Sequence, residues 1–127
     1  MEFVSVAVGG AIGAVTRYVV SGWAASRWGG HFPYGTLLVN VVGCFLIGLI
    51  MVLLMERLNV GPYWRLILVV GFLGGLTTFS SFGLETVSLF EQARWTAALG
   101  NVALNVVVGC IATFLAYIHI FSVGYIK

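Results

Sequence analysis

Charged residues are scarce in this sequence. Asp, Glu, Lys and Arg make up 8% of its 127 residues, whereas an ordinary soluble domain contains about 25%. Hydrophobic residues make up 61%. A chain of this length has too much surface for its volume to hide so many apolar side chains from water. The composition therefore excludes a water-soluble domain and indicates a protein embedded in a lipid bilayer.

Residues that could carry catalysis or bind a metal are also scarce. The two cysteines and two histidines lack the spacing of metal ligands, so we assign no chemistry to Cys44, Cys110, His31 and His119. We find no nucleophile with a matching base, no phosphate-binding loop and no paired carboxylates in the apolar stretches. The basic residues form no cluster that could bind nucleic acid. The sequence therefore predicts neither an enzyme nor a nucleic-acid partner.

Four stretches with few or no charges are long enough to cross a bilayer, whose hydrocarbon core needs about 20 helical residues. They predict transmembrane helices over residues 3–24, 36–55, 64–90 and 95–122, all within one domain, residues 1–127. Trp and Tyr cluster at the ends of these spans, as is typical of membrane interfaces. The first ten residues contain no Lys or Arg, so we expect no cleaved signal peptide. The predicted fold is an all-α integral membrane protein.

The basic residues favour neither orientation in the membrane. With four spans the two termini share one side, and each side carries three basic residues: Arg57, Arg65 and Lys127 against Arg17, Arg27 and Arg94. The positive-inside rule then sets no preference. A chain that inserts both ways can pair with an inverted copy of itself. We therefore predict an antiparallel homodimer with dual topology.

The strongly polar side chains of the spans all fall in one half of the bilayer when each is placed by its helical rise. They are Arg17, Asn40, Glu85, Asn101 and Asn105. One copy of the chain therefore offers a polar path that ends near the midplane. An antiparallel pair would offer such a path from each side.

The most informative segment is GFLGGLTTFSSF, residues 71–82, in the middle of the third span. Glycines followed by four hydroxyl residues form a poor helix, and irregular backbone at this depth is tolerated only inside protein or beside a cavity. We predict a helix break at the midplane, whose freed carbonyls two copies would bring together as a site for a hard cation. The alternative is a continuous helix whose hydroxyls bond to their own turn.

Aromatic and amide side chains near this segment could bind an anion. Phe79 and Phe82 share one face of a helix, and the positive edge of an aromatic ring can meet a small anion. Asn40 can donate its amide to an anion. Asn101 and Asn105 lie four residues apart and could continue such a path. The alternatives are aromatic packing for the two Phe residues and interhelical hydrogen bonds for the three Asn residues.

Arg17 is the cation placed deepest in a predicted span, where its charge is costly unless it is paired, snorkels to the interface or has a function. Glu85 falls at a similar depth in the same half and is its expected partner. Arg17 could also bind carbonyls at a helix end or raise the local concentration of anions. Gly9, Gly10 and Gly13 predict a helix face that packs closely against another helix.

Three segments resemble the Fluc (CrcB) family of fluoride channels in order, spacing and position within the spans. They are GGAIGAVTR at 9–17, GTLLVN at 35–40 and GFLGGLTTFSSF at 71–82, followed by Glu85. The resemblance implies two antiparallel subunits that form two fluoride pores, with a structural sodium ion at the dimer centre. It also implies passive fluoride export across the inner membrane of a bacterial cell.

Carried over by position, the resemblance implies that the carbonyls of Gly74 and Thr77 bind the sodium ion. Asn40, Phe79 and Phe82 would face the fluoride path, and Ser80 would lie beside it. Asn101 and Asn105 stand where the family is expected to have hydroxyl residues. A small dual-topology multidrug or cation exporter is the alternative function, but it needs an embedded carboxylate early in the chain, where this sequence has Arg17.

Overall fold

The structure, a computed structural model, describes residues 1–123, without the side chains of residues 55, 56, 121 and 123. Lys127, which the predicted charge balance includes, lies outside the described residues. Four helical stretches are long and apolar enough to cross a membrane: Glu2–Trp28, Tyr34–Leu54, Pro62–Glu91 and Trp95–Ile120. The prediction of an all-α protein with four spans is therefore confirmed for the part of the chain that the structure describes.

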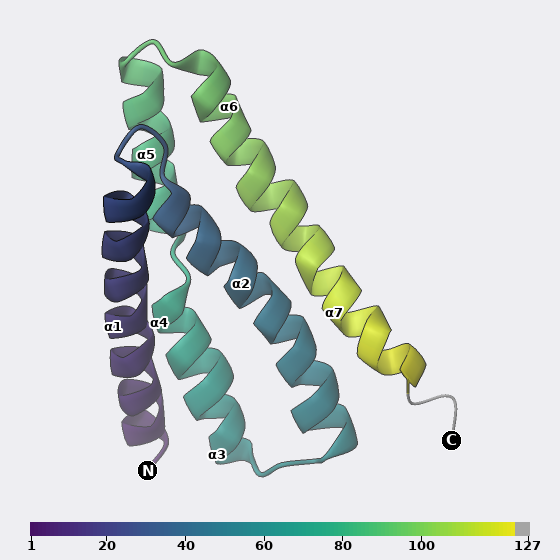
Figure 1. The fold of residues 1–127 in the computed structure, drawn as a ribbon. Helices are drawn as coiled ribbons and strands as arrows, with labels where there is room; N and C mark the ends of the chain where they lie inside the picture. Colours follow the sequence, from purple (N-terminus) through teal and green to yellow (C-terminus); the bar gives the residue numbers. More distant parts are fainter. Residues whose placement is uncertain (124–127) are drawn as a thin grey trace.

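The elements follow one another along the chain as Figure 1 shows. They are α1 (Glu2–Trp28), α2 (Tyr34–Ile50) with a π-helical continuation (Met51–Arg57), α3 (Pro62–Arg65), a π-helical segment (Leu66–Leu73), α4 (Gly74–Leu76), α5 (Phe79–Glu91), α6 (Trp95–Ala103), a further π-helical segment (Leu104–Val108) and α7 (Gly109–Val123). Two prolines mark helix starts: Pro33 precedes α2, and Pro62 is the first residue of α3, where its missing N–H costs no hydrogen bond.

The third span breaks near its middle, between α4 and α5. Thr77 and Thr78 are extended, with φ/ψ of −82°/156° and −152°/120°. Thr78 caps the start of α5, because its hydroxyl accepts the N–H of Ser81 at 3.2 Å. The predicted helix break is confirmed, and the alternative of a continuous helix is wrong.

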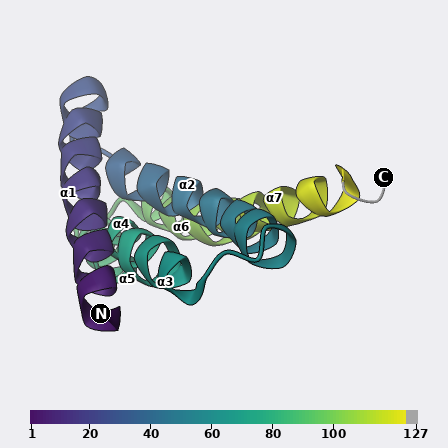
Figure 2. The same ribbon diagram turned by 90° about the horizontal axis from the view of Figure 1, so that it is seen from below.

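The spans pack in pairs around this break. Helix α1 lies along the first half of the third span, α2 lies along α7, and α5 and α6 are joined by a short turn (Figure 1). Seen from below, α2 lies between α1 and the end of α7 (Figure 2). Large apolar side chains such as Phe3 and Phe114 are exposed along the outside, which is expected of a surface that faces lipid.

Glycine determines how closely α1 approaches the third span. A Cβ on Gly9 would overlap the carbonyl of Ile67, and one on Gly13 would overlap the carbonyl of Phe72. The predicted close-packing face of α1 is therefore confirmed at Gly9 and Gly13. A Cβ on Gly10 would make only an ordinary contact, 3.9 Å from the carbonyl of Gly71. This packing brings Arg17, one turn after Gly13, to the level of the break.

Candidate functional site

The helix break frees backbone carbonyls, among them those of Gly74 and Thr77. In a continuous helix the carbonyl of Gly74 would accept the N–H of Thr78, but that N–H donates to Asn40 Oδ1 at 2.8 Å. The carbonyl of Thr77 would accept the N–H of Ser81, which donates instead to the hydroxyl of Thr78. Gly74 and Thr77, the two residues that the resemblance connects with sodium, therefore present carbonyl oxygens that the helix does not use.

Arg17 binds at this break. Its Nη1 donates to the carbonyl of Thr77 at 3.4 Å. Arg17 therefore binds a carbonyl at a helix end, which was one of the alternatives for this residue. The expected pairing of Arg17 with Glu85 is wrong, because Glu85 lies eight residues beyond Thr77 and a helix rises about 1.5 Å per residue. Glu85 Oε1 instead accepts the hydroxyl of Thr36 at 2.6 Å. Its Oε2 is buried without a hydrogen-bond partner among the groups that the structure describes.

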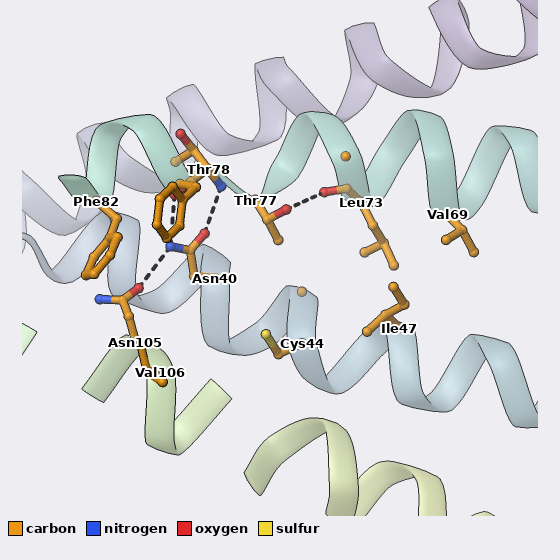
Figure 3. A pocket seen from close by; sticks show the side chains of 13 residues that line it. Asn40, Cys44, Ile47, Val69, Leu73, Thr77, Thr78, Phe82, Asn105 and Val106 are labelled. Atoms are coloured by element: carbon orange, nitrogen blue, oxygen red, sulfur yellow. Dashed lines mark hydrogen bonds between the residues drawn. The ribbon is translucent and has the colours of Figure 1, made fainter. Parts of the chain in front are cut away.

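Asn40 is held against the backbone of the break. Its Oδ1 accepts the N–H of Thr78, and its Nδ2 donates to the carbonyl of the same residue at 3.1 Å. Its Nδ2 also donates to Asn105 Oδ1 at 2.9 Å, as Figure 3 shows. Asn40 thus fixes the extended conformation of Thr78 and connects α2 with the fourth span.

The hydrogen bonds continue from Asn105 into the protein. Asn105 Nδ2 donates to both the backbone carbonyl and Oδ1 of Asn101 at 3.0 Å. Asn101 Nδ2 donates to the hydroxyl of Thr86 at 3.0 Å, and that hydroxyl donates to the carbonyl of Phe82 at 2.8 Å. We call this chain of Thr78, Asn40, Asn105, Asn101 and Thr86 the amide network. It joins the break to the middle of α5.

A pocket of about 390 Å³ lies beside the break. Asn40, Thr78 and Asn105 line its polar end, and Leu73, Phe79 and Phe82 are among its apolar lining. Figure 3 shows Phe82 close to the Asn40–Asn105 pair. The pocket therefore combines amide groups with aromatic rings, as the sequence predicted for an anion path.

The two phenylalanines differ in exposure. Their ring centroids are 5.4 Å apart at an interplanar angle of 51°, yet Phe79 is 81% exposed and Phe82 only 8%. Gly74 and Ser80 are exposed as well. The side of the pocket formed by Phe79 and Gly74 therefore faces outward from this chain.

The asparagines of the fourth span lie in different places. Asn105 lines the pocket, whereas Asn101 is 0% exposed and bonds across to α5. The structure thus gives Asn101 the interhelical hydrogen bonds that were its alternative. Ser80 lies beside the pocket, with its hydroxyl 3.3 Å from that of Thr78.

A second pocket of about 330 Å³ opens near the loop between α1 and α2 and is more polar. Its lining includes His31, Thr36, Glu85, Ser88 and Arg94. Thr36 and Asn40 are one helical turn apart on α2 and share a face, so the two pockets follow one another along that helix. The sequence alone assigned no role to Thr36 or Thr86. For Thr36, the only signal that could have indicated a role is its position one helical turn before Asn40.

The chain is similar both to a known protein family and to individual known proteins. Residues 4–117 match the family described as CrcB-like protein, Camphor Resistance (CrcB). The chain is 49% identical over 114 residues to the fluoride-specific ion channel FluC of Solibacter usitatus, covering 90% of this chain and 93% of the relative. It is 53% identical over 98 residues to the FluC of a Roseiflexus species, covering 77% and 79%. It is 50% identical over 109 residues to the FluC of Rhizobium etli, covering 86% and 87%.

Proposed function

The chain belongs to the Fluc (CrcB) family of fluoride-specific ion channels, and we propose that it conducts fluoride selectively and passively out of a bacterial cell across the inner membrane. It is a multi-pass membrane protein, and the family consists of channels, not enzymes. The observation that carries the proposal is the pocket at the break, where Asn40 lies with Phe79 and Phe82.

Fluoride is small and strongly hydrated, so a path must replace its water donors while remaining too narrow for larger anions. Amide and hydroxyl groups of Asn40, Thr78 and Ser80 can supply donors without a charge. The ring edges of Phe79 and Phe82 add positive potential. The guanidinium of Arg17 at the break raises the concentration of anions nearby. These features support passage of fluoride along α2, from the second pocket to the first.

An antiparallel homodimer would complete the fluoride path across the bilayer. The amide network lies in the same half of the spans as the second pocket, and the pocket at the break opens where Phe79 is 81% exposed. An inverted second copy, placed against that open side, would close the pocket and continue the path through the other half of the bilayer. A balanced distribution of basic residues permits both orientations.

A structural sodium ion fits the same arrangement. The carbonyls of Gly74 and Thr77 are released from the helix, and oxygen atoms are the ligands that hard cations prefer. Arg17 uses one lone pair of the Thr77 carbonyl, which leaves the second for a cation. Gly74 is exposed on the open side, where a second copy would bring its own carbonyls. The ion would therefore hold the two copies together and would not be transported.

Fluoride conduction is tested with purified protein in liposomes loaded with potassium fluoride. After a potassium ionophore is added, a fluoride electrode should record rapid efflux, while liposomes loaded with potassium chloride should retain chloride. Proteoliposomes that retain fluoride as long as protein-free liposomes do would contradict the proposal. Proton-coupled uptake of a cationic dye in the same preparation would favour the multidrug-exporter alternative.

Removal of sodium should destabilise the dimer. An ion present at about 100 times its Kd contributes about 2.7 kcal/mol of stabilisation, so replacing sodium by N-methylglucamine should shift the monomer–dimer equilibrium toward monomer and lower fluoride flux. Single-molecule photobleaching counts the subunits per particle at increasing dilution in lipid. Potassium serves as a control for ionic strength. If dimer fraction and flux are the same in sodium and N-methylglucamine, the proposed cation site is wrong.

A further inference from the structure

The backbone at the break determines the orientation of every amide in the amide network. The N–H of Thr78 can only donate and its carbonyl can only accept, so Asn40 must direct Oδ1 to the first and Nδ2 to the second. The remaining N–H of Asn40 then requires an acceptor, which is Asn105 Oδ1. Asn105 Nδ2 in turn faces the backbone carbonyl of Asn101, which can only accept. The polarity of each hydrogen bond is therefore fixed.

This arrangement uses every amide N–H that could meet an anion in the pocket. An asparagine amide has two N–H donors, and both donors of Asn40 are occupied, by Thr78 and by Asn105. Asn105 directs its own Nδ2 away from Asn40 to two oxygens of Asn101, which is 0% exposed. Among the described residues that line the pocket, no amide donor of the network is free. An anion at Asn40 must therefore break an existing hydrogen bond.

We propose that Asn105 Oδ1 occupies the place of the permeating anion and that fluoride displaces it from Asn40, which makes Asn105 a specificity-determining residue of the proposed channel. The inference rests on the proposed function. Asn40 keeps its orientation during the exchange, because its two bonds to the Thr78 backbone do not involve Asn105. Asn105 is half-buried and lines the pocket, so its carboxamide has space into which it can turn.

The exchange discriminates between anions by their strength as hydrogen-bond acceptors. Asn105 Oδ1 is a neutral amide oxygen, and a hydrogen bond to an ionised acceptor is about twice as strong as one between neutral groups. The compact charge of fluoride meets this requirement better than the diffuse charge of chloride. A resident acceptor thus excludes weak acceptors from Asn40 even where the pocket has room for them. This form of selection adds to the width set by the phenylalanine rings.

The test measures how flux depends on fluoride concentration in Asn105→Ala and Asn105→Leu. Both variants remove the resident acceptor, but they change the side-chain volume in different ways. Because one hydrogen bond no longer has to be broken, the half-saturating fluoride concentration should fall about threefold to tenfold in both. If Asn105 instead binds fluoride directly, the same variants should raise that concentration. An unchanged or raised value in both would overturn the inference.

Thr113→Val is the matched control. The hydroxyl of Thr113 connects the fourth span to α2 by donating to the carbonyl of Cys44 at 2.8 Å, and Thr113 lies outside the amide network. The half-saturating fluoride concentration of Thr113→Val should stay within about twofold of the parent, because the hydrogen bond that it removes involves neither Asn40 nor Asn105 and independent sites couple only weakly. A decrease equal to that of Asn105→Ala would show that loosening the fourth span is sufficient, and would overturn the inference. A parent protein that conducts no fluoride would contradict the proposed function itself.

A second measurement needs no variant at Asn105. The chain has four asparagines, Asn40, Asn59, Asn101 and Asn105, so selective 15N labelling gives four pairs of side-chain amide signals in NMR spectra of the protein in micelles. Adding sodium fluoride should move the signals of Asn40 and Asn105 together, with sodium chloride as the control. Saturating fluoride that moves Asn40 while leaving Asn105 unchanged would overturn the inference even if both substitutions prevent folding.

Discussion

Phe82→Ile should lower fluoride flux at least about tenfold, equivalent to about 1.4 kcal/mol in the barrier, while the protein still folds. Phe82 is only 8% exposed and lies at the polar end of the pocket, beside Asn105 in Figure 3. Isoleucine retains an apolar surface but has no ring edge with positive potential. An anion at this point would then lose a favourable electrostatic contact that packing cannot replace. Initial efflux rates from proteoliposomes measure the effect.

Phe114→Ile is the control for this substitution. Phe114 is 62% exposed on α7 and lies outside the lining of the pocket at the break, so the same chemical change there should leave flux close to that of the parent. Phe79→Ile should act in the same direction as Phe82→Ile, because both rings line that pocket. Parental flux in a Phe82→Ile protein that elutes like the parent on a sizing column would mean that the ring only packs.

The helix break could be predicted because local chemistry determines it. Glycines followed by hydroxyl residues weaken the helix at 71–82, and the depth of the segment in the span requires that the freed groups be satisfied inside protein. The close approach of α1 could be predicted for the same kind of reason, since Gly9 and Gly13 carry no side chain. In both cases the residues that give the signal are the residues that make the structure.

The partners of polar side chains could not be predicted in this way. Depth along a span suggested that Arg17 pairs with Glu85, but depth gives neither the rotation of a helix nor the level at which two helices meet. The close packing at Gly13 places Arg17 against Thr77, and Glu85 lies about two turns further on. Asn101 and Asn105 likewise look equivalent in sequence, yet one is buried against α5 and the other lines the pocket.

The π-helical turns had no sequence signal either, because segments such as Leu66–Leu73 are apolar on every face and show no change of period. The dimer and the sodium ion remain predictions that depend on a second copy. These predictions rest on the outward-facing Phe79 and on the released carbonyls of Gly74 and Thr77, which one chain shows.

Asn40→Asp should lower fluoride flux more than Phe82→Ile does, by about a hundredfold relative to the parent. The substitution nearly preserves shape and keeps an acceptor for the N–H of Thr78, but it replaces the amide donor by oxygen. In the parent, the Thr78 carbonyl and Asn105 Oδ1 accept hydrogen bonds from Asn40 Nδ2 at 3.1 Å and 2.9 Å. In the variant, each of these oxygens would face another acceptor. Fluoride at this position would lose its hydrogen bond from the amide, and a hydrogen bond to a charged group contributes about 1.5–3 kcal/mol, which corresponds to about a hundredfold. An ionised carboxylate would also repel fluoride. Efflux from proteoliposomes measures the loss.

Asn59→Asp makes the same chemical change in the loop between α2 and α3, where the side chain is exposed and far along the chain from the break. Its flux should stay near that of the parent, which separates the effect of a lost donor from that of one added negative charge. Asn40→Asp must also elute like the parent, because Asn40 holds Thr78 in its extended conformation and a collapsed break would block conduction for another reason. A folded Asn40→Asp protein with parental flux would reduce Asn40 to an interhelical hydrogen bond. The fluoride path would then have to run elsewhere than past the Asn40–Asn105 pair.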